Sequence, residues 1–200
     1  MNGYWTSLEH RNEQGIHIIS RGLHWLLAIL MIGLIWVGWH MVGLDYYDKW
    51  YHTALSVHRA VGITVLVLAV TALGWRLMVP PPGFVPTIRR WERIAASVTH
   101  ATLYGMMIAL PIIGYLISTS AGDPIPMFGW LEVPAWIVVD EATRNTAVVA
   151  HYYLAYATAL LVVVHILAAL KHHFVDRDDT LRRMLKAKTI NNWDKHWDKR

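Results

Sequence analysis

The chain has 200 residues, of which 55% are hydrophobic and only 16% are charged, and its formal net charge is +4. An average soluble domain has about 25% charged residues, so this composition is that of a protein embedded in a membrane. Cysteine is absent, which excludes disulfides, iron–sulfur clusters, thiolate zinc sites and covalently attached c-type haem. The 12 histidines leave imidazole, together with carboxylate, as the ligands for any metal chemistry.

Four long stretches contain no Asp, Glu, Lys or Arg, and they cover residues 23–44, 60–75, 94–122 and 145–170. A helix needs about 20 mostly apolar residues to cross the hydrocarbon core of a bilayer. The second stretch is shorter, but it also spans when Arg59 and Arg76 lie at the interfaces, where long side chains reach water. We therefore predict an all-α integral membrane four-helix bundle, with spans at about residues 20–43, 55–79, 93–118 and 147–171. The bundle occupies residues 1–175, and a basic cytoplasmic tail follows over residues 176–200.

The first two predicted spans each contain one histidine near the start of the span. His24 lies about one turn inside the first span, and His58 lies near the beginning of the second, directly before Arg59. The second span ends at residues 80–83 (Pro-Pro-Pro-Gly), because this run cannot continue a helix. Since consecutive spans run in opposite directions, His24 and His58 are expected at opposite ends of the bundle.

The third span contains His100 near its start, and a long connection over residues 123–144 leads to a fourth span with two histidines. His151 and His165 are 14 residues apart in this span. At a rise of about 1.5 Å per residue, His165 lies about 21 Å further along the helix. At about 100° per residue, both side chains point in the same direction to within about 40°. The fourth span therefore presents two imidazoles on one face, one near each end.

The distribution of Lys and Arg predicts the orientation of the bundle. The N-terminal segment, the second connection and the C-terminal segment together hold 15 of these residues, whereas the opposite side holds only Lys49, Arg59 and Arg144. Cytoplasmic loops of membrane proteins are enriched in Lys and Arg. We therefore expect both termini in the cytoplasm, with His24 and His165 near the cytoplasmic side.

Each histidine of the fourth span needs a partner at its own depth, and His58 matches His151 while His24 matches His165. Two stacked bis-histidine sites are what two haems require, because each haem iron takes two axial imidazoles for electron transfer. Zinc is disfavoured, since such pairs without nearby carboxylates do not make a four-coordinate site. A single membrane histidine more often only bonds a neighbour, but two depth-matched pairs favour ligation. His100 remains a spare candidate ligand, a partner for a haem propionate or a packing residue.

Other polar residues near the span ends each have two interpretations. Arg59 is expected to pair with a haem propionate or to attract an anionic substrate. His172 lies seven residues after His165, on the same face and about 10 Å nearer the cytoplasm. Together with Arg21 or Lys171, it is a candidate for holding a quinone headgroup. An ordinary juxtamembrane histidine is the simpler interpretation of the same residue.

Several motifs resemble the prokaryotic cytochrome b561 family. They are residues 23–26 (Leu-His-Trp-Leu), 57–62 (Val-His-Arg-Ala-Val-Gly), 109–114 (Ala-Leu-Pro-Ile-Ile-Gly), and most specifically 165–173 (His-Ile-Leu-Ala-Ala-Leu-Lys-His-His) followed by 178–184 (Asp-Asp-Thr-Leu-Arg-Arg-Met). The resemblance covers about residues 18–184. It implies a four-helix bundle with two b-type haems, whose ligands match His24, His58, His151 and His165. It also implies that His172 lies in a quinone region.

The resemblance implies a function as well. A superoxide:ubiquinone oxidoreductase of this family takes electrons from periplasmic superoxide and passes them to membrane ubiquinone. We therefore expect a membrane oxidoreductase of the bacterial inner membrane that transfers electrons from a periplasmic donor to ubiquinone. The alternative is a cytochrome b anchor subunit that serves a partner dehydrogenase or a soluble cytochrome and has no substrate of its own. A haem-free transporter is the weakest option, because four helices without internal repeats are few for that task.

The charge of the predicted outer face bears on the identity of the donor and of other partners. This face has a formal balance of −3, from Asp45, Asp48, Asp123, Glu132, Asp140 and Glu141 against Lys49, Arg59 and Arg144. A surface that collects the superoxide anion needs a positive field. A basic periplasmic electron carrier therefore suits this face at least as well. We expect lipid and quinone as partners and no nucleic acid, and the sequence leaves homodimer formation open.

Overall fold

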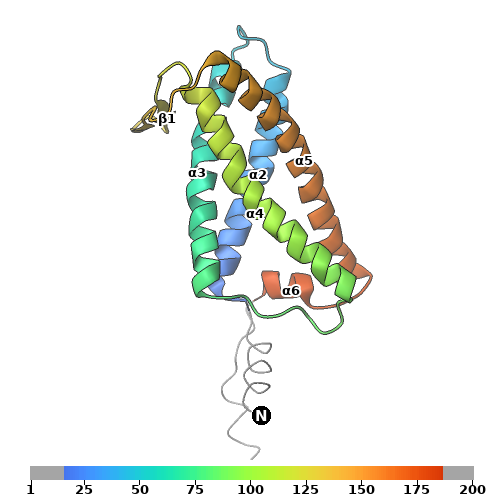
Figure 1. Ribbon diagram of the computed structural model, residues 1–200. Coiled ribbons are helices and arrows are strands. Elements are labelled where there is room, and N and C mark those ends of the chain that lie inside the picture. The colour runs from blue at the N-terminus through green and yellow to red at the C-terminus, as the bar shows by residue number, and fades with distance from the viewer. Residues whose placement is uncertain (1–15, 187–200) are drawn as a thin grey trace, which may run out of the picture.

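The computed structural model describes residues 16–186 of the chain. Within this range, the elements are α2 (Ile18–Val42), α3 (Tyr51–Met78), α4 (Arg90–Thr119), β1 (Ile125–Met127), β2 (Leu131–Val133), α5 (Glu141–Phe174) and α6 (Thr180–Leu185). The four long helices form an up-and-down bundle, and the short α6 lies across one end of it (Figure 1). Each long helix is long and apolar enough to cross a membrane, which confirms the predicted four-helix membrane bundle.

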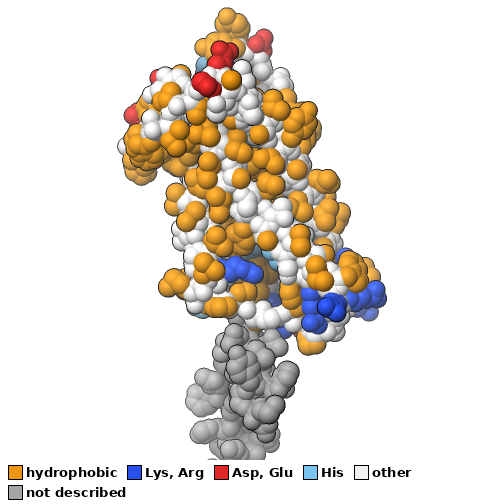
Figure 2. Space-filling model, in the orientation of Figure 1, with side chains coloured by type: hydrophobic (Ala, Val, Ile, Leu, Met, Phe, Trp, Pro, Cys, Tyr) orange, Lys and Arg blue, Asp and Glu red, His pale blue; other side chains and the backbone are white. Residues whose placement is uncertain are grey.

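The bundle has two ends that differ in structure and in charge. The hairpin end holds the β1–β2 hairpin, the α2–α3 loop and the start of α5, whereas the tail end holds the start of α2, the α3–α4 connection and α6 (Figure 1). On the face drawn in Figure 2, Lys and Arg side chains gather at the tail end and Asp and Glu side chains at the hairpin end. The charge asymmetry counted along the sequence is therefore also an asymmetry in space.

Local signals define where the long helices begin and end. At the start of α2, the Nδ1 of His17 accepts a hydrogen bond from the Ile19 N–H at 3.2 Å. At the start of α5, the carboxylate of Asp140 accepts one from the Thr143 N–H at 2.7 Å. Hydrogen bonding with Thr143 holds the pKa of Asp140 below its usual value. Helix α3 stops at Met78, with Val79 as its C-cap before the run of prolines, which confirms the break predicted there.

Packing inside the bundle is tightest between neighbouring helices, and the outward faces are apolar. Helix α2 packs on α3, α3 on α4, and α4 on α5. Leu27, Met31, Val65 and Ala72 form a buried cluster between α2 and α3. Large apolar side chains such as Trp36 and Leu160 are exposed along the helices, and in a membrane these faces contact lipid.

The connection between α4 and α5 contains a hairpin that the sequence did not predict. Ile125 of β1 is buried, and the strand lies against α3. The segment after β2 is fastened to α4 by Tyr115. The hydroxyl of Tyr115 donates to the Pro134 carbonyl at 2.9 Å and accepts from the Trp136 N–H at 2.7 Å. These contacts hold the long connection against the bundle.

Candidate functional site

The structure brings together one predicted histidine pair at the hairpin end. His58 of α3 and His151 of α5 have ring centres 6.2 Å apart, with ring planes at 69°. Each ring also lies close to a glycine of a neighbouring helix. A Cβ added at Gly38 of α2 would lie 3.2 Å from the His58 ring, and one at Gly114 of α4 would lie 3.3 Å from the His151 ring. A larger residue at either glycine would displace the imidazole, since packed interiors leave little room.

The second predicted pair comes together near the tail end. His24 of α2 and His165 of α5 have ring centres 6.3 Å apart, with ring planes at 63°. The ring of His100, from α4, lies 5.3 Å from that of His165. Three imidazoles from three helices therefore meet at this level, whereas two meet at the other.

The separations of 6.2 and 6.3 Å suit two imidazoles on opposite sides of one metal ion. A histidine nitrogen binds such an ion at about 2 Å and its ring centre lies about 1 Å further away, so two opposed ligands have ring centres roughly 6 Å apart. The separation of 5.3 Å between His100 and His165 is shorter than this. Aromatic rings that only pack against each other also have centres about 4.5–7 Å apart. The separations within the two predicted pairs therefore permit ligation of a metal ion without requiring it.

An arginine with a buried nitrogen lies next to each pair along the sequence. Arg59 directly follows His58, and Arg21 precedes His24 by three residues. The Nε atoms of both arginines are buried, and neither has a hydrogen-bond partner within residues 16–186. A buried N–H needs an acceptor, and the two propionates of a haem are acceptors of the required charge. The residues at both levels therefore fit a haem.

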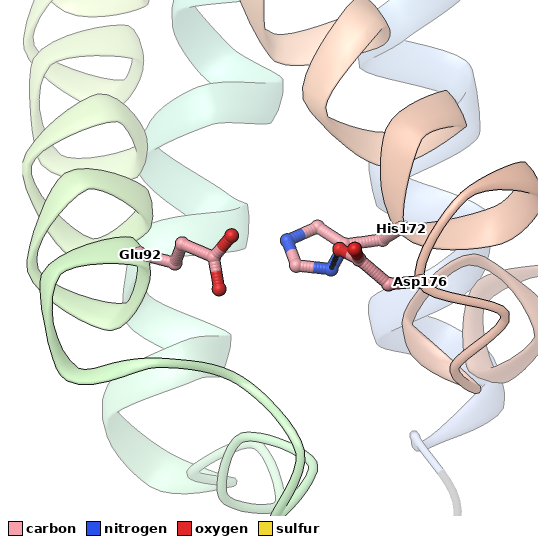
Figure 3. Close-up of side chains that lie close together, drawn as sticks. All are labelled: Glu92, His172 and Asp176. Carbon is pink, nitrogen blue, oxygen red and sulfur yellow. Dashed lines mark ion pairs between the residues drawn. The ribbon is translucent and has the colours of Figure 1, made fainter.

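A network of charged side chains lies at the tail end, between the start of α4 and the end of α5 (Figure 3). The ammonium of Lys171 contacts the carboxylate of Glu92 and lies 2.8 Å from that of Asp176. The Nδ1 of His172 lies 2.8 Å from Asp178 and 3.1 Å from Asp176. Figure 3 shows the His172 ring between Glu92 and Asp176, with its second nitrogen facing Glu92.

This network is better described as ion pairs than as a metal site. Glu92, His172 and Asp176 offer three ligand atoms that lie within 4.8 Å of one another. However, the Lys171 ammonium already contacts both carboxylates and supplies the positive charge that a cation would bring. A buried carboxylate such as Glu92 is stable only when it is paired in this way.

Asp178 is the most buried acid of the connection between α5 and α6. Burial raises the pKa of its carboxyl, but hydrogen bonding with Thr180 and His172 outweighs this effect, and the pKa lies below its usual value. Two of the three residues predicted to hold a quinone headgroup, Lys171 and His172, belong to the network. Among the described residues, no hydrogen bond or ion pair joins the third, Arg21, to it.

Sequence reasoning singled out Gly114 as making room for close helix packing, but it missed the contacts of Gly38 and Gly114 with the histidine rings and the acidic residues of the network. The glycines do have a signal, because Gly38 follows His24 by 14 residues and Gly114 follows His100 by 14 residues. This is the spacing that separates the two histidines of α5, and it places the residues on one helix face at two levels. Asp176 and Asp178 follow His172 by four and six residues, whereas Glu92 comes from a segment far away in the chain, so no spacing connects it to the others.

Comparisons with known proteins show the family to which the chain belongs. The family model of the prokaryotic cytochrome b561 matches residues 16–187. Cytochrome b561 homolog 2 of Escherichia coli K12 is 45% identical over 168 residues, which are 84% of this chain and 89% of that protein. The probable superoxide oxidase CybB of Yersinia pestis is 34% identical over 169 residues, which are 84% of this chain and 93% of that protein. The predicted resemblance is thus confirmed, and the chain belongs to the prokaryotic cytochrome b561 family, as a multi-pass electron-transfer protein of the bacterial inner membrane.

Proposed function

We propose that the chain transfers electrons across the membrane through two b-type haems, one held by His58 and His151 and the other by His24 and His165. The observation that carries this proposal is the occurrence of two histidine pairs with nearly equal ring separations, at opposite ends of one bundle and joined by α5. A bound haem supplies the one-electron chemistry that the side chains lack. The four histidines would hold the two iron atoms, and the apolar bundle would keep water away from them.

We assign contacts with the haem propionates to Arg59 at the hairpin end and to Arg21 and His100 at the tail end. The buried and unpaired Nε atoms of the two arginines within the described range support this assignment. Arg21 was predicted as a quinone ligand, and its position one turn before His24 favours the propionate instead. The ring of His100 lies against that of His165, which supports a role beside the ligands rather than as one of them.

The charge asymmetry supports an orientation of the bundle in the membrane, and the proposed donor and acceptor then give the direction of transfer. Because Lys and Arg gather at the tail end, we place that end in the cytoplasm and the hairpin end in the periplasm. The His58–His151 level then accepts electrons from a periplasmic donor, and the His24–His165 level delivers them to membrane ubiquinone. The start of α2 and the end of α6 lie on the cytoplasmic side in this orientation, whereas the predicted cytoplasmic termini themselves lie outside the described residues.

Two observations bear on the donor in opposite ways. The name of the Yersinia relative, a probable superoxide oxidase, supports superoxide. The formal balance of −3 at the hairpin end opposes collection of an anion and favours a basic electron carrier. Arg59 provides a local positive charge beside His58, which an anionic donor requires. We retain superoxide as the first donor to test.

The tail-end network has the groups that quinone reduction needs. Reduction of ubiquinone to the quinol takes up two electrons and two protons. Asp178 and Asp176 hold the Nδ1 side of the His172 ring, and we assign the other ring nitrogen, which faces Glu92, to the binding of a quinone carbonyl. Asp176 is partly exposed, so the network reaches water at this residue.

The haem content of the purified protein tests this proposal directly. We expect a dithionite-reduced minus oxidised spectrum of low-spin b-type cytochrome, with two haems per chain. The variant His151→Ala should retain one haem, whereas His40→Ala should retain two, because His40 is exposed and stacks on Trp36. A folded preparation without haem would refute the proposal, and full occupancy in His151→Ala would show that the ligand pairing is wrong.

The anchor-subunit alternative is favoured by one observation, namely that Lys171 and His172 are already engaged by carboxylates. An assay of the isolated protein with superoxide and a soluble ubiquinone analogue separates the two functions. Turnover that disappears in His151→Ala supports the oxidoreductase. A dehydrogenase that co-purifies in stoichiometric amount, without turnover by the isolated chain, supports the anchor. The mass of the purified particle also tests whether the chain forms a homodimer, which the sequence leaves open.

A further inference from the structure

The turn of the β1–β2 hairpin exposes large apolar side chains. The turn consists of Phe128, Gly129 and Trp130, and it is followed by Leu131 at the start of β2. The exposed fractions of Phe128 and Trp130 are 60% and 78%, and that of Leu131 is 49%. A contiguous patch of this kind on a loop indicates a contact with an apolar partner. We call residues 128–131 the hairpin tip.

The hairpin tip is held in a defined position. Ile125 and Met127 are both buried, and they face α3 from the same side of the ribbon. The register places Met127 opposite Leu131, at the base of the turn. Phe128 has a φ of 54°, a left-handed conformation that is unfavourable for a bulky residue. The fold therefore keeps an aromatic side chain in the turn at a conformational cost.

The position of the hairpin identifies the partner. In Figure 1 the hairpin lies at the side of the bundle, beside α3 and lower than the α2–α3 loop, rather than above the helix ends. In Figure 2 the apolar side chains at this corner continue into those along the sides of the helices below. The sides of the helices face lipid, so the hairpin tip extends a surface that already contacts the membrane.

One charged residue limits how deep the hairpin tip lies. Glu132 is exposed and pairs with Pro126 across the ribbon, on the face opposite to Ile125. A carboxylate and the unpaired edges of two short strands are too costly to place in hydrocarbon. The headgroup region accepts both, and aromatic side chains concentrate there.

We propose that the hairpin tip is a membrane anchor that inserts Phe128 and Trp130 into the headgroup region of the leaflet at the hairpin end. The anchor ties the α4–α5 connection to the bilayer beside α3. It depends on neither haem nor quinone, so it stands or falls independently of the proposed electron transfer.

The absence of cysteine allows a test with single labels. Trp130→Cys is labelled with a nitroxide in phospholipid vesicles, and its collisions with oxygen and with a water-soluble nickel chelate are measured by electron paramagnetic resonance. Tyr47→Cys, at a position 91% exposed in the α2–α3 loop, is the water reference. Val67→Cys, at a position 60% exposed in the middle of α3, is the lipid reference. We expect Trp130→Cys between the two, with nickel collisions several-fold fewer than at Tyr47→Cys.

Two outcomes would overturn the anchor. Collision rates equal to those of Tyr47→Cys would place the hairpin tip in water. Low collision rates with both reagents would mean that protein covers it, such as a second copy of the chain. Phe128→Cys repeats the measurement at the neighbouring position, and helical circular dichroism checks that each variant is folded, so one unstable variant does not decide the result.

Discussion

The histidine pairs at the two ends of the bundle use the same faces of α2 and α4 in different ways. At the hairpin end these helices contribute Gly38 and Gly114, whose backbones approach the rings of the pair. At the tail end, 14 residues earlier in each helix, α2 contributes His24 and α4 contributes His100. The hairpin-end pair therefore has two closely packed rings, whereas the tail-end pair has a third imidazole beside it.

The two pairs illustrate two ways in which a helix bundle can position a ligand: glycines around the ring, or an additional imidazole beside it. Glycine gives the ring space and fixes its position through backbone contact, so the site depends on both histidines. A third imidazole adds a group that can form a hydrogen bond or replace a lost ligand, so we expect this site to tolerate the loss of one partner in part. Within residues 16–186, no third histidine ring contacts the hairpin-end pair. The two levels should consequently respond differently to the same kind of substitution.

The largest effect is expected for His58→Ala. The variant should lose the hairpin-end haem completely, because no other imidazole contacts His151 within the described residues. The haem content per chain, measured by the pyridine haemochrome, should fall from two to one. His52→Ala is a matched control on the same helix, at an exposed position. If His58→Ala retained two haems, the hairpin-end pair would not need both of its histidines, and the expected difference between the two ends of the bundle would be wrong.

A smaller loss is expected for His24→Ala. The ring of His100 lies 5.3 Å from that of His165 and is placed to substitute in part. The haem content should fall between one and two per chain, with a changed spectrum for the tail-end haem. The double variant His24→Ala/His100→Ala should contain one haem. If the single variant already contains only one, His100 is not an alternative ligand.

Asp178→Asn tests how the tail end is stabilised. We expect the variant to keep both haems and to lose about 1–3 kcal/mol of stability at neutral pH, as for a charge-assisted hydrogen bond in a buried position. The pKa of Asp178 lies below its usual value of 3.8 in the folded protein. Its contribution is therefore complete above pH 3.8 and is lost as the pH falls through the lower folded value.

The measurement for Asp178→Asn is thermal unfolding in detergent as a function of pH. The difference from the unsubstituted protein should shrink in acid. Asp179→Asn is the matched control, because the neighbouring side chain is exposed and its ion pair with Arg182 is 3.5 Å long. A surface pair of this kind contributes about 0–1 kcal/mol. Equal effects of the two substitutions would mean that burial of Asp178 does not matter.

The smallest effect is expected for Gly114→Ala. The added Cβ would lie 3.3 Å from the His151 ring, so the ring must shift by a few tenths of an ångström. We expect no loss of haem but a change in the reduction potential and the paramagnetic resonance signal of the hairpin-end haem. Gly105→Ala is the control on the same helix, because nothing lies within 4 Å of its Cβ position. An identical reduction potential in Gly114→Ala and Gly105→Ala would show that the His151 ring has room for the added methyl group.

The four helices were predictable because a membrane span must be long and free of charge. Stretches without charged residues located each helix, and the proline run after Met78 located one end. The observed helices extend beyond the predicted spans, most clearly α5, which begins at Glu141 after the Asp140 cap. The β1–β2 hairpin was not predicted, because strands of three residues have no measurable alternation and the turn uses Phe128 at positive φ.

The site was predictable in part for the same physical reason. Helical periodicity places His151 and His165 on one face of the same helix. The depth of each residue in the membrane then selects its partner, so both ring contacts could be predicted from residue numbers along the spans. The tail-end network was not predictable. It joins Glu92 to Lys171 across two helices, and only the packing of α4 on α5 brings them together.

Helix α5 supplies one histidine to each pair, and this has a mechanical consequence. Fourteen helical steps separate His151 from His165, about 21 Å, and a hydrogen-bonded helix keeps that length nearly constant. Their partners come from α2 and α3, which pack on each other. When the bilayer thickens or thins, α2 and α3 can shift against α5 and alter the ligand geometry at each level. The distance between the levels stays the same, so lipid composition should affect how electrons enter and leave the protein more than how they pass within it.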